Sequence, residues 1–130
     1  MTDRARVTGI GGIFFKSSDP KALSEWYAKH LGVPYTPGQG AAFNWADDPQ
    51  PDGGMTVWSA FPADTKYFGP GSSPFMINFR VADIDALVAQ LTAEGVQVDP
   101  KRDDYDYGRF AWIYDPEGNK IELWQPLPPK

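Results

Sequence analysis

The sequence contains no cysteine and a single histidine, His30, among its 130 residues. The lack of cysteine excludes disulfides, thiolate metal sites and cysteine nucleophiles. No hydrophobic run approaches the roughly 20 residues that span a membrane, and no apolar segment follows the basic start, so we expect a cytoplasmic protein without membrane contact. Basic residues number 12 against 17 acidic ones, and the net charge of -5 argues against nucleic acid as a partner.

Aromatic side chains are abundant: they make up 15% of the residues and include five tryptophans. Two short aromatic-rich runs flank the turn formers at 115–119, which predicts an antiparallel hairpin over 108–124. Pairing Tyr114 with Lys120 places Trp112 opposite Glu122. Because side chains alternate along a strand, one face then carries Phe110, Trp112, Glu122 and Trp124, and the other is a core face of Ala111, Ile113, Ile121 and Leu123.

The rest of the chain reads as alternating strands and helices. Asp19 and Asp83 are placed as N-caps, Pro20 follows at a first helical position, and Gly32 and Gly95 supply the stops. We therefore expect, in order, a strand at 7–16, a helix up to Gly32, strands at 43–45 and 55–58, a connector at 61–74, a strand at 75–81, a helix up to Gly95, a short strand at 96–98, a charged loop at 99–107, and the hairpin.

The two halves of the chain match each other at a nearly constant spacing. The matched residues are Ile13 with Ile77, Phe15 with Phe79, Leu23 with Leu87, Trp45 with Trp112, and Trp58 with Trp124. This predicts an α+β fold of two tandem βαβββ modules, at about 7–60 and 75–126, joined by the linker 61–74. We expect one domain over 1–130, with a curved mixed sheet that encloses a half-barrel cavity and helices on its outer face.

The sequence resembles the vicinal oxygen chelate superfamily, which includes glyoxalase I, extradiol dioxygenases and bleomycin-resistance proteins. The resemblance is carried by the segments 19–27 (DPKALSEWY), 79–87 (FRVADIDAL) and 115–124 (DPEGNKIELW). Metal-dependent relatives hold an ion at four inward positions, which the resemblance places at Gly12, Thr56, Met76 and Glu122. Only Glu122 is a charged hard-cation ligand, and an open catalytic site needs about three protein ligands. We therefore expect no metal and no cofactor.

Strand alternation, together with the loop at 105–109, predicts which side chains face the cavity. The expected ligand-binding residues are Phe43, Trp45, Thr56, Trp58, Met76, Asn78, Tyr107, Arg109, Phe110, Trp112 and Trp124, with Glu122 as the candidate catalytic group. An aromatic lining with few polar groups is typical of a small-molecule pocket, and equally of a filled aromatic core. Glu122 is expected to pair with a basic neighbour, Lys16, Arg80 or Arg109. The loops 61–68 and 105–109 could close over the cavity, and ordinary surface covering or packing against a second subunit explains them equally well.

The favoured function is a metal-independent, glyoxalase/bleomycin-resistance-like protein that binds a small planar organic molecule. One alternative is a metal-free or unusual-metal enzyme, a lyase, isomerase or dioxygenase-like member, with Glu122 as general base. Another is a structural dimer without a ligand. The resemblance implies a homodimer in each case.

Overall fold

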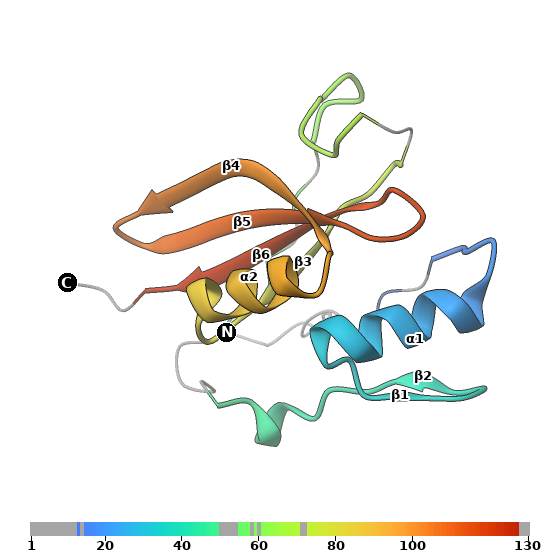
Figure 1. Ribbon diagram of the computed structural model, residues 1–130. Helices are drawn as coiled ribbons and strands as arrows, with labels where there is room; N and C mark the ends of the chain where they lie inside the picture. The colour runs from blue at the N-terminus through green and yellow to red at the C-terminus, as the bar shows by residue number, and fades with distance from the viewer. Residues whose placement is uncertain are drawn as a thin grey trace, which may run out of the picture.

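The computed structural model of the chain describes residues 13, 15–49, 55–57, 59, 61–70 and 73–127. In these residues, two α-helices, a short 3-10 helix, a two-stranded sheet and a four-stranded sheet make up an α+β fold (Figure 1). The elements in chain order are α1 (Pro20–Leu31), β1 (Tyr35–Thr36), β2 (Gly40–Ala41), the 3-10 helix η1 (Trp45–Asp47), β3 (Ile77–Arg80), α2 (Ile84–Ala93), β4 (Gln97–Tyr105), β5 (Gly108–Tyr114) and β6 (Lys120–Pro126). None of the described helices is long and apolar enough to cross a membrane.

Both helices begin and end where local chemistry predicts. The Asp19 carboxylate accepts a hydrogen bond from the Ala22 N–H at 3.1 Å, and Asp83 accepts one from Ala86 at 3.0 Å. These side chains satisfy amide groups that have no partner inside the helix. Gly32 follows α1 with φ 67°, a left-handed conformation that favours glycine. The predicted N-caps are confirmed.

The large sheet has the strand order β3-β6-β5-β4. Strand β3 runs parallel to β6, and the other neighbours are antiparallel. In the hairpin, Tyr114 pairs with Lys120 and Trp112 with Glu122, as predicted. The second half is therefore one strand–helix–three-strand module. The tandem arrangement of two such modules stays a prediction.

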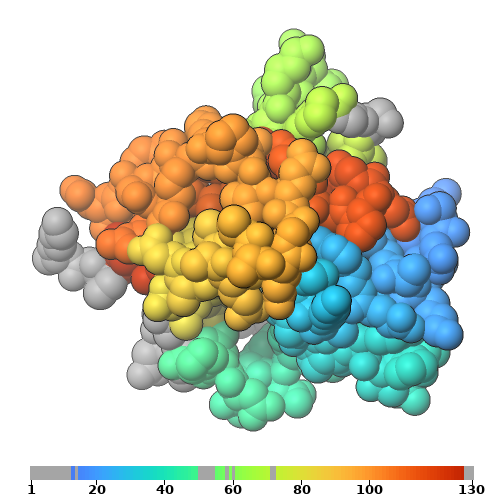
Figure 2. All heavy atoms as spheres, in the orientation of Figure 1, coloured from blue at the N-terminus to red at the C-terminus, as the bar shows by residue number. Residues whose placement is uncertain are grey.

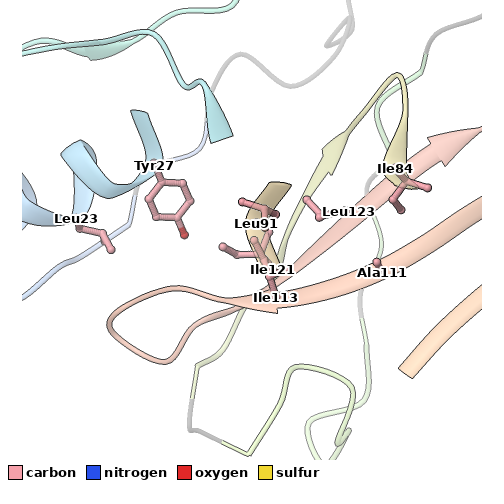
Figure 3. Close-up of a cluster of buried hydrophobic side chains, with 8 residues drawn as sticks. All are labelled: Leu23, Tyr27, Ile84, Leu91, Ala111, Ile113, Ile121 and Leu123. Atoms are coloured by element: carbon pink, nitrogen blue, oxygen red, sulfur yellow. The ribbon is translucent and has the colours of Figure 1, made fainter. Parts of the chain in front are cut away.

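The hydrophobic core lies between this sheet and the two helices. Figure 3 shows the cluster, whose buried members are Leu23 and Tyr27 from α1, Ile84 and Leu91 from α2, and Ala111, Ile113, Ile121 and Leu123 from the β5–β6 hairpin. The alternation of the hairpin thus places its aliphatic residues against the helices, as predicted. Within the described part of the chain, no helix packs on its other face, which is called the helix-free face below.

The turn between β5 and β6 is fastened to α1 through Asp115, which is 5% exposed. Its carboxylate accepts hydrogen bonds from the Tyr27 hydroxyl at 2.8 Å, the Glu117 N–H at 2.9 Å, and the Asn119 N–H and side-chain amide at 2.9 and 2.8 Å. Burial, with the adjacent Asp115 carboxylate, raises the pKa of Tyr27. The Ser17 hydroxyl donates to Glu117 at 2.6 Å. The first and second halves of the chain meet at this turn.

Strand β4 is longer than the sequence indicated. The predicted loop at 99–107 is wrong, because most of it pairs with β5 as far as Tyr105. The register shifts between Val98 and Arg102, which accommodates Pro100 without a ladder hydrogen bond. Charged side chains on an edge strand are common because they discourage pairing with other chains. Because of these charged residues, the sequence of β4 has the composition of a loop, and most of the strand was therefore not predicted.

The predicted strands of the first half are not found among the described residues. Residues 43–45 and 55–57 form no strand, and Trp45 begins η1. Asp48, which follows η1, forms an ion pair with Arg80, the last residue of β3. This contact holds the segment around η1 near the end of β3, where it does not pair as a strand. The expected strand at 7–16 lies mostly outside the described residues, and its described positions are not in a strand.

A hydrogen bond between the Tyr114 hydroxyl and the Asp99 carboxylate, at 2.6 Å, ties β5 to β4. This bond lowers the pKa of Asp99 and raises the pKa of Tyr114 to about 12. The lowered carboxyl pKa gives stability that is present above the ordinary value of about 4 and is lost as the pH falls through the lowered value. The raised phenol pKa gives stability that is present below about pH 10 and is lost as the pH rises through the raised value.

We expect Tyr114→Phe to lower the free energy of unfolding by at most about 1 kcal/mol near neutral pH, since solvent screens this half-buried pair. The difference from the wild type should shrink as the pH falls below about 4. Urea unfolding across a pH series measures it, with Tyr35→Phe as the control. A difference that stays constant down to acid pH would contradict this assignment.

Candidate functional site

The helix-free face of the four-stranded sheet gathers the polar and aromatic side chains. Alternation along β5 and β6 puts Trp112 and Glu122 side by side on it. Strand β3 adds Asn78, which is in register with Glu122, and Arg80, which is in register with Trp124. These three strands therefore supply the predicted polar anchors from one continuous surface.

Glu122 is the centre of this face and is only 8% exposed. Its carboxylate accepts hydrogen bonds from the Trp112 indole at 3.0 Å, the Asn78 amide at 2.7 Å, and the Tyr67 hydroxyl. Burial, together with the hydrogen bond to Glu122 and its charge, raises the pKa of Tyr67. The three donors are neutral, and among the described residues Glu122 forms no ion pair. The expected basic partner is therefore wrong.

The Trp112 ring forms the floor of the site and is 1% exposed. The edge of Tyr67 meets it at 6.0 Å between ring centroids, with the planes 83° apart. The ammonium groups of Lys101 and Lys120 lie 5.6 and 5.5 Å from the Trp112 centroid. Cations at this distance from an indole ring are attracted to its π system. A phenol ring and two amines thus cover the indole beside the carboxylate.

A second aromatic group continues along the same face toward the β4–β5 turn. Phe110 and Trp124 lie parallel, with 6.3 Å between centroids, and Tyr107 meets Phe110 edge-on at 6.2 Å. The Trp124 indole nitrogen is buried and has no hydrogen-bond partner among the described residues. A Cβ at Gly108 would lie 2.8 Å from that nitrogen, so the glycine makes room for the indole.

The donor set does not fit a hard metal ion. The described residues contain no group of three or more histidine, cysteine, aspartate or glutamate side chains that could hold one. The Glu122 oxygens already accept three hydrogen bonds, and Thr56 and Met76 are neutral. A metal-dependent mechanism therefore has no ligand set on the described part of this face.

Several predicted site residues lie elsewhere. Phe43 and Trp45 are 63% and 82% exposed and do not join the Trp112 face, because their segment is not a strand of this sheet. Thr56 is exposed, whereas Met76 is half-buried just before β3. By contrast, Tyr107 is 65% exposed at the β4–β5 turn but contacts Phe110 at the end of the aromatic group described above. Gly12 and Trp58 lie outside the described residues.

Arg109 is on the wrong face for a ligand contact at Glu122. Its guanidinium donates to Asp85 of α2 at 3.1 Å, on the helix side of the sheet. The reason is that β5 begins at Gly108, so Arg109 already follows the strand alternation and points away from Phe110. The prediction of Arg109 as a site residue is corrected here.

Three residues of the site were not predicted: Tyr67, Lys101 and Lys120. Lys120 could have been found, because it lies two residues before Glu122 on the same strand face. Lys101 was not predicted because its segment was expected to be a loop, whereas it belongs to β4. Tyr67 belongs to the segment 61–68 that was expected to close over the cavity, but no pattern in the sequence indicated its contact with Glu122.

Two surface cavities lie away from Glu122. One, of about 420 Å³, is lined by Phe43, Trp45, Asp48, Arg80 and neighbouring residues. The other, of about 520 Å³, is lined by Lys16, Phe75, Glu117 and residues around them. Neither lining includes Glu122, Trp112 or Tyr67. At Glu122, in contrast, the Tyr67 side chain lies against the carboxylate and the Trp112 ring.

Residues 12–124 match the family model described as a glyoxalase-like domain. A search of the curated proteins gave no significant match. Among solved structures, the chain is similar to TnmS3, an antibiotic binding protein from Streptomyces sp. CB03234, with 29% identity, coverage of 85% of this chain and 88% of that chain, and a TM-score of 0.51.

Two further structures share the fold. A member of the glyoxalase/bleomycin resistance protein/dioxygenase superfamily from Sphaerobacter thermophilus DSM 20745 has 25% identity, covers 84% of this chain and 90% of that chain, and has a TM-score of 0.50. A glyoxalase-related enzyme from Fulvimarina pelagi has 19% identity to this chain and a TM-score of 0.54. The match covers 92% of this chain and 88% of that chain.

Proposed function

The chain belongs to the glyoxalase-like domain family, and from this premise we propose that it binds a small planar organic molecule on the helix-free face of its sheet. Glu122 and Asn78 orient the molecule through hydrogen bonds. Trp112 and Trp124 supply the aromatic surface on which it packs. The binding does not use a metal.

The observation that carries this proposal is the buried Glu122 carboxylate among aromatic rings. A buried carboxylate costs free energy unless hydrogen bonds replace its hydration, and here three neutral donors do so. A mostly aromatic surface with a few convergent polar groups is the usual composition of a small-molecule site. The helices already cover the opposite face, so the aromatic face is not needed to build the main core.

The similarity to TnmS3 supports a binding function. That protein is described as an antibiotic binding protein, and the match covers most of both chains. The fold by itself hosts many activities and does not choose among them. The neutral hydrogen-bonding environment of Glu122 is what favours binding of an organic molecule here over metal-assisted chemistry.

The test is a titration of tryptophan fluorescence with a panel of planar aromatic compounds, neutral and cationic, because Trp112 and Trp124 would report their binding. We expect saturable quenching in the wild type. Glu122→Gln should bind at least about tenfold more weakly, since a charged acceptor is replaced by an amide whose NH2 faces other donors. Glu25→Gln, an exposed carboxylate on α1, is the matched control. Equal affinity of wild type and Glu122→Gln would contradict the proposal.

We also propose that two copies of the chain associate. Most of the exposed large apolar side chains among the described residues belong to the first half of the chain, namely Ile13, Phe15, Phe43, Trp45, Met55, Val57 and Phe61. Exposed apolar surface of this kind is typical of a protein–protein interface. Light scattering coupled to size exclusion should give the mass of a dimer. A monomer mass at tens of micromolar protein would contradict this.

A further inference from the structure

The segment 61–70 has no regular secondary structure, and it stands out as the yellow-green lobe at the top of Figure 2. It meets the site through Tyr67. The hydroxyl of Tyr67 donates to Glu122, and the Lys120 ammonium donates to the Tyr67 carbonyl at 3.0 Å. The segment is thus attached over the buried carboxylate by the Tyr67 side chain and the Tyr67 main chain, and Gly69 also lies close to Lys120.

The ring of Tyr67 is surrounded as a bound aromatic molecule would be. Its edge meets the Trp112 ring at 6.0 Å, and Phe61 stacks on it at 5.6 Å with only 4° between the planes. The Lys120 ammonium lies 5.2 Å from its centroid. Of these groups, the Trp112 ring, the Lys120 ammonium and the Glu122 acceptor belong to the sheet and stay in place for another phenol ring, whereas Phe61 belongs to the same segment as Tyr67.

Resting on the function proposed above, we propose that Tyr67 is an internal occupant of the ligand position, and that the ligand class is a hydroxylated planar aromatic, a phenol, whose hydroxyl replaces that of Tyr67 on Glu122. Binding of the ligand displaces the Tyr67 side chain from the carboxylate. The segment 61–70 carries that side chain away from the sheet.

The charges at the site define which aromatics fit. Glu122 is an acceptor, so the ligand must present a donor, and an aryl carboxylate would face the Glu122 charge directly. An aromatic methyl ether has no donor and would leave the Trp112 and Asn78 donors as the only partners of the carboxylate. The raised pKa of Tyr67 agrees with a hydroxyl that stays protonated while it donates. Phenols should therefore bind better than the corresponding ethers, hydrocarbons or carboxylates.

An internal occupant weakens the apparent affinity for an external one, because only the fraction of molecules with Tyr67 displaced can bind. Removing the ring should abolish this competition. It should also leave a space that matches 4-methylphenol, the molecule that corresponds to the tyrosine side chain.

The experiment follows 4-methylphenol binding to wild type, Tyr67→Ala and Tyr67→Phe by the indole N–H signal of Trp112 in NMR spectra. We expect Tyr67→Ala to bind 4-methylphenol at least about tenfold more tightly than the wild type. Toluene and 4-methylanisole should bind Tyr67→Ala at least about tenfold more weakly than 4-methylphenol, for want of the donor. Adding Glu122→Gln to Tyr67→Ala should reduce that preference for the hydroxyl. Tyr35→Ala, which removes a tyrosine in β1, is the control and should bind 4-methylphenol as the wild type does.

The outcomes separate the two proposals. If Tyr67→Ala folds as the wild type by circular dichroism but binds 4-methylphenol no better than the wild type does, Tyr67 is a wall of the site or a structural latch, and the occupant proposal is overturned. The proposed function would still stand if planar compounds quench the tryptophan fluorescence of the wild type and Glu122→Gln weakens their binding. If no planar compound binds the wild type or any variant, both proposals fail. Tyr67→Phe keeps the ring, so tighter binding of 4-methylphenol by this variant would show that the hydroxyl holds the occupant in place.

Discussion

Asp115→Ala is expected to lower the free energy of unfolding by about 3 kcal/mol, because several donors lose their acceptor at once. The Tyr27 hydroxyl is the most costly of them, since Tyr27 is 6% exposed and water does not reach it readily. The amide donors of Glu117 and Asn119 lie in the turn, where water can replace part of the lost hydrogen bonding. Urea unfolding followed by circular dichroism measures the loss.

Two companion variants make the result for Asp115 specific. Asp115→Asn keeps one acceptor oxygen and should cost less than Asp115→Ala. In a double-mutant cycle with Tyr27→Phe, the coupling free energy should be about 1–3 kcal/mol, as for a buried hydrogen bond to a charged group. Asp64→Ala, at an exposed aspartate of the segment 61–70, should change stability by less than about 0.5 kcal/mol. An Asp115→Ala protein as stable as the wild type would show that the turn is not held to α1 by this carboxylate.

Trp112→Ala is expected to cost about 3–5 kcal/mol of unfolding free energy, the range for removing a large buried aromatic side chain. The ring is 1% exposed, and its indole N–H is one of the three donors to Glu122. The variant loses both the packed ring and a hydrogen bond to a buried charge. It should also lose the quenching of tryptophan fluorescence by planar compounds, because the floor of the site is gone.

Trp112→Phe separates the two contributions, because it keeps a buried ring and removes the N–H donor. It should be destabilised less than Trp112→Ala, with weaker binding of planar compounds. Tyr107→Ala is the control for stability, since that ring is 65% exposed, and it should stay within about 0.5 kcal/mol of the wild type. Thermal and urea unfolding measure both effects. If Trp112→Ala and Tyr107→Ala proved equally stable, the ring of Trp112 would not be the packed floor described here.

The parts of the fold predicted from the sequence are those decided by residues close together in the chain. The helix caps at Asp19 and Asp83 depend on amides three residues away. The hairpin register follows from one turn and a strict alternation, so Trp112 and Glu122 could be paired in advance. Where the prediction relied on composition it was wrong, as for β4, whose charged residues belong to an edge strand.

The errors in the candidate site have the same kind of physical cause. Arg109 was counted with the loop 105–109 that could close over the cavity, but it lies inside β5, where the strand alternation turns its side chain to the helix side of the sheet. Trp45 was placed on the Trp112 face by the internal repeat, but a strand also needs a pairing partner, and its segment is held near β3 by the Asp48–Arg80 ion pair. A repeat in sequence constrains side-chain types more strongly than it constrains pairing.

The sequence by itself determined the family resemblance, the second strand–helix–three-strand module, and the presence of Glu122 beside Trp112 on one face. These follow from local turns, caps and the two-residue period of a strand. The tertiary structure alone decided what lies on that face: Tyr67 reaches Glu122 across 55 positions of the chain, and Asp48 reaches Arg80 across 32. Contacts of such long range depend on how loops without regular structure are laid over the sheet, and no residue pattern within the loop encodes that placement.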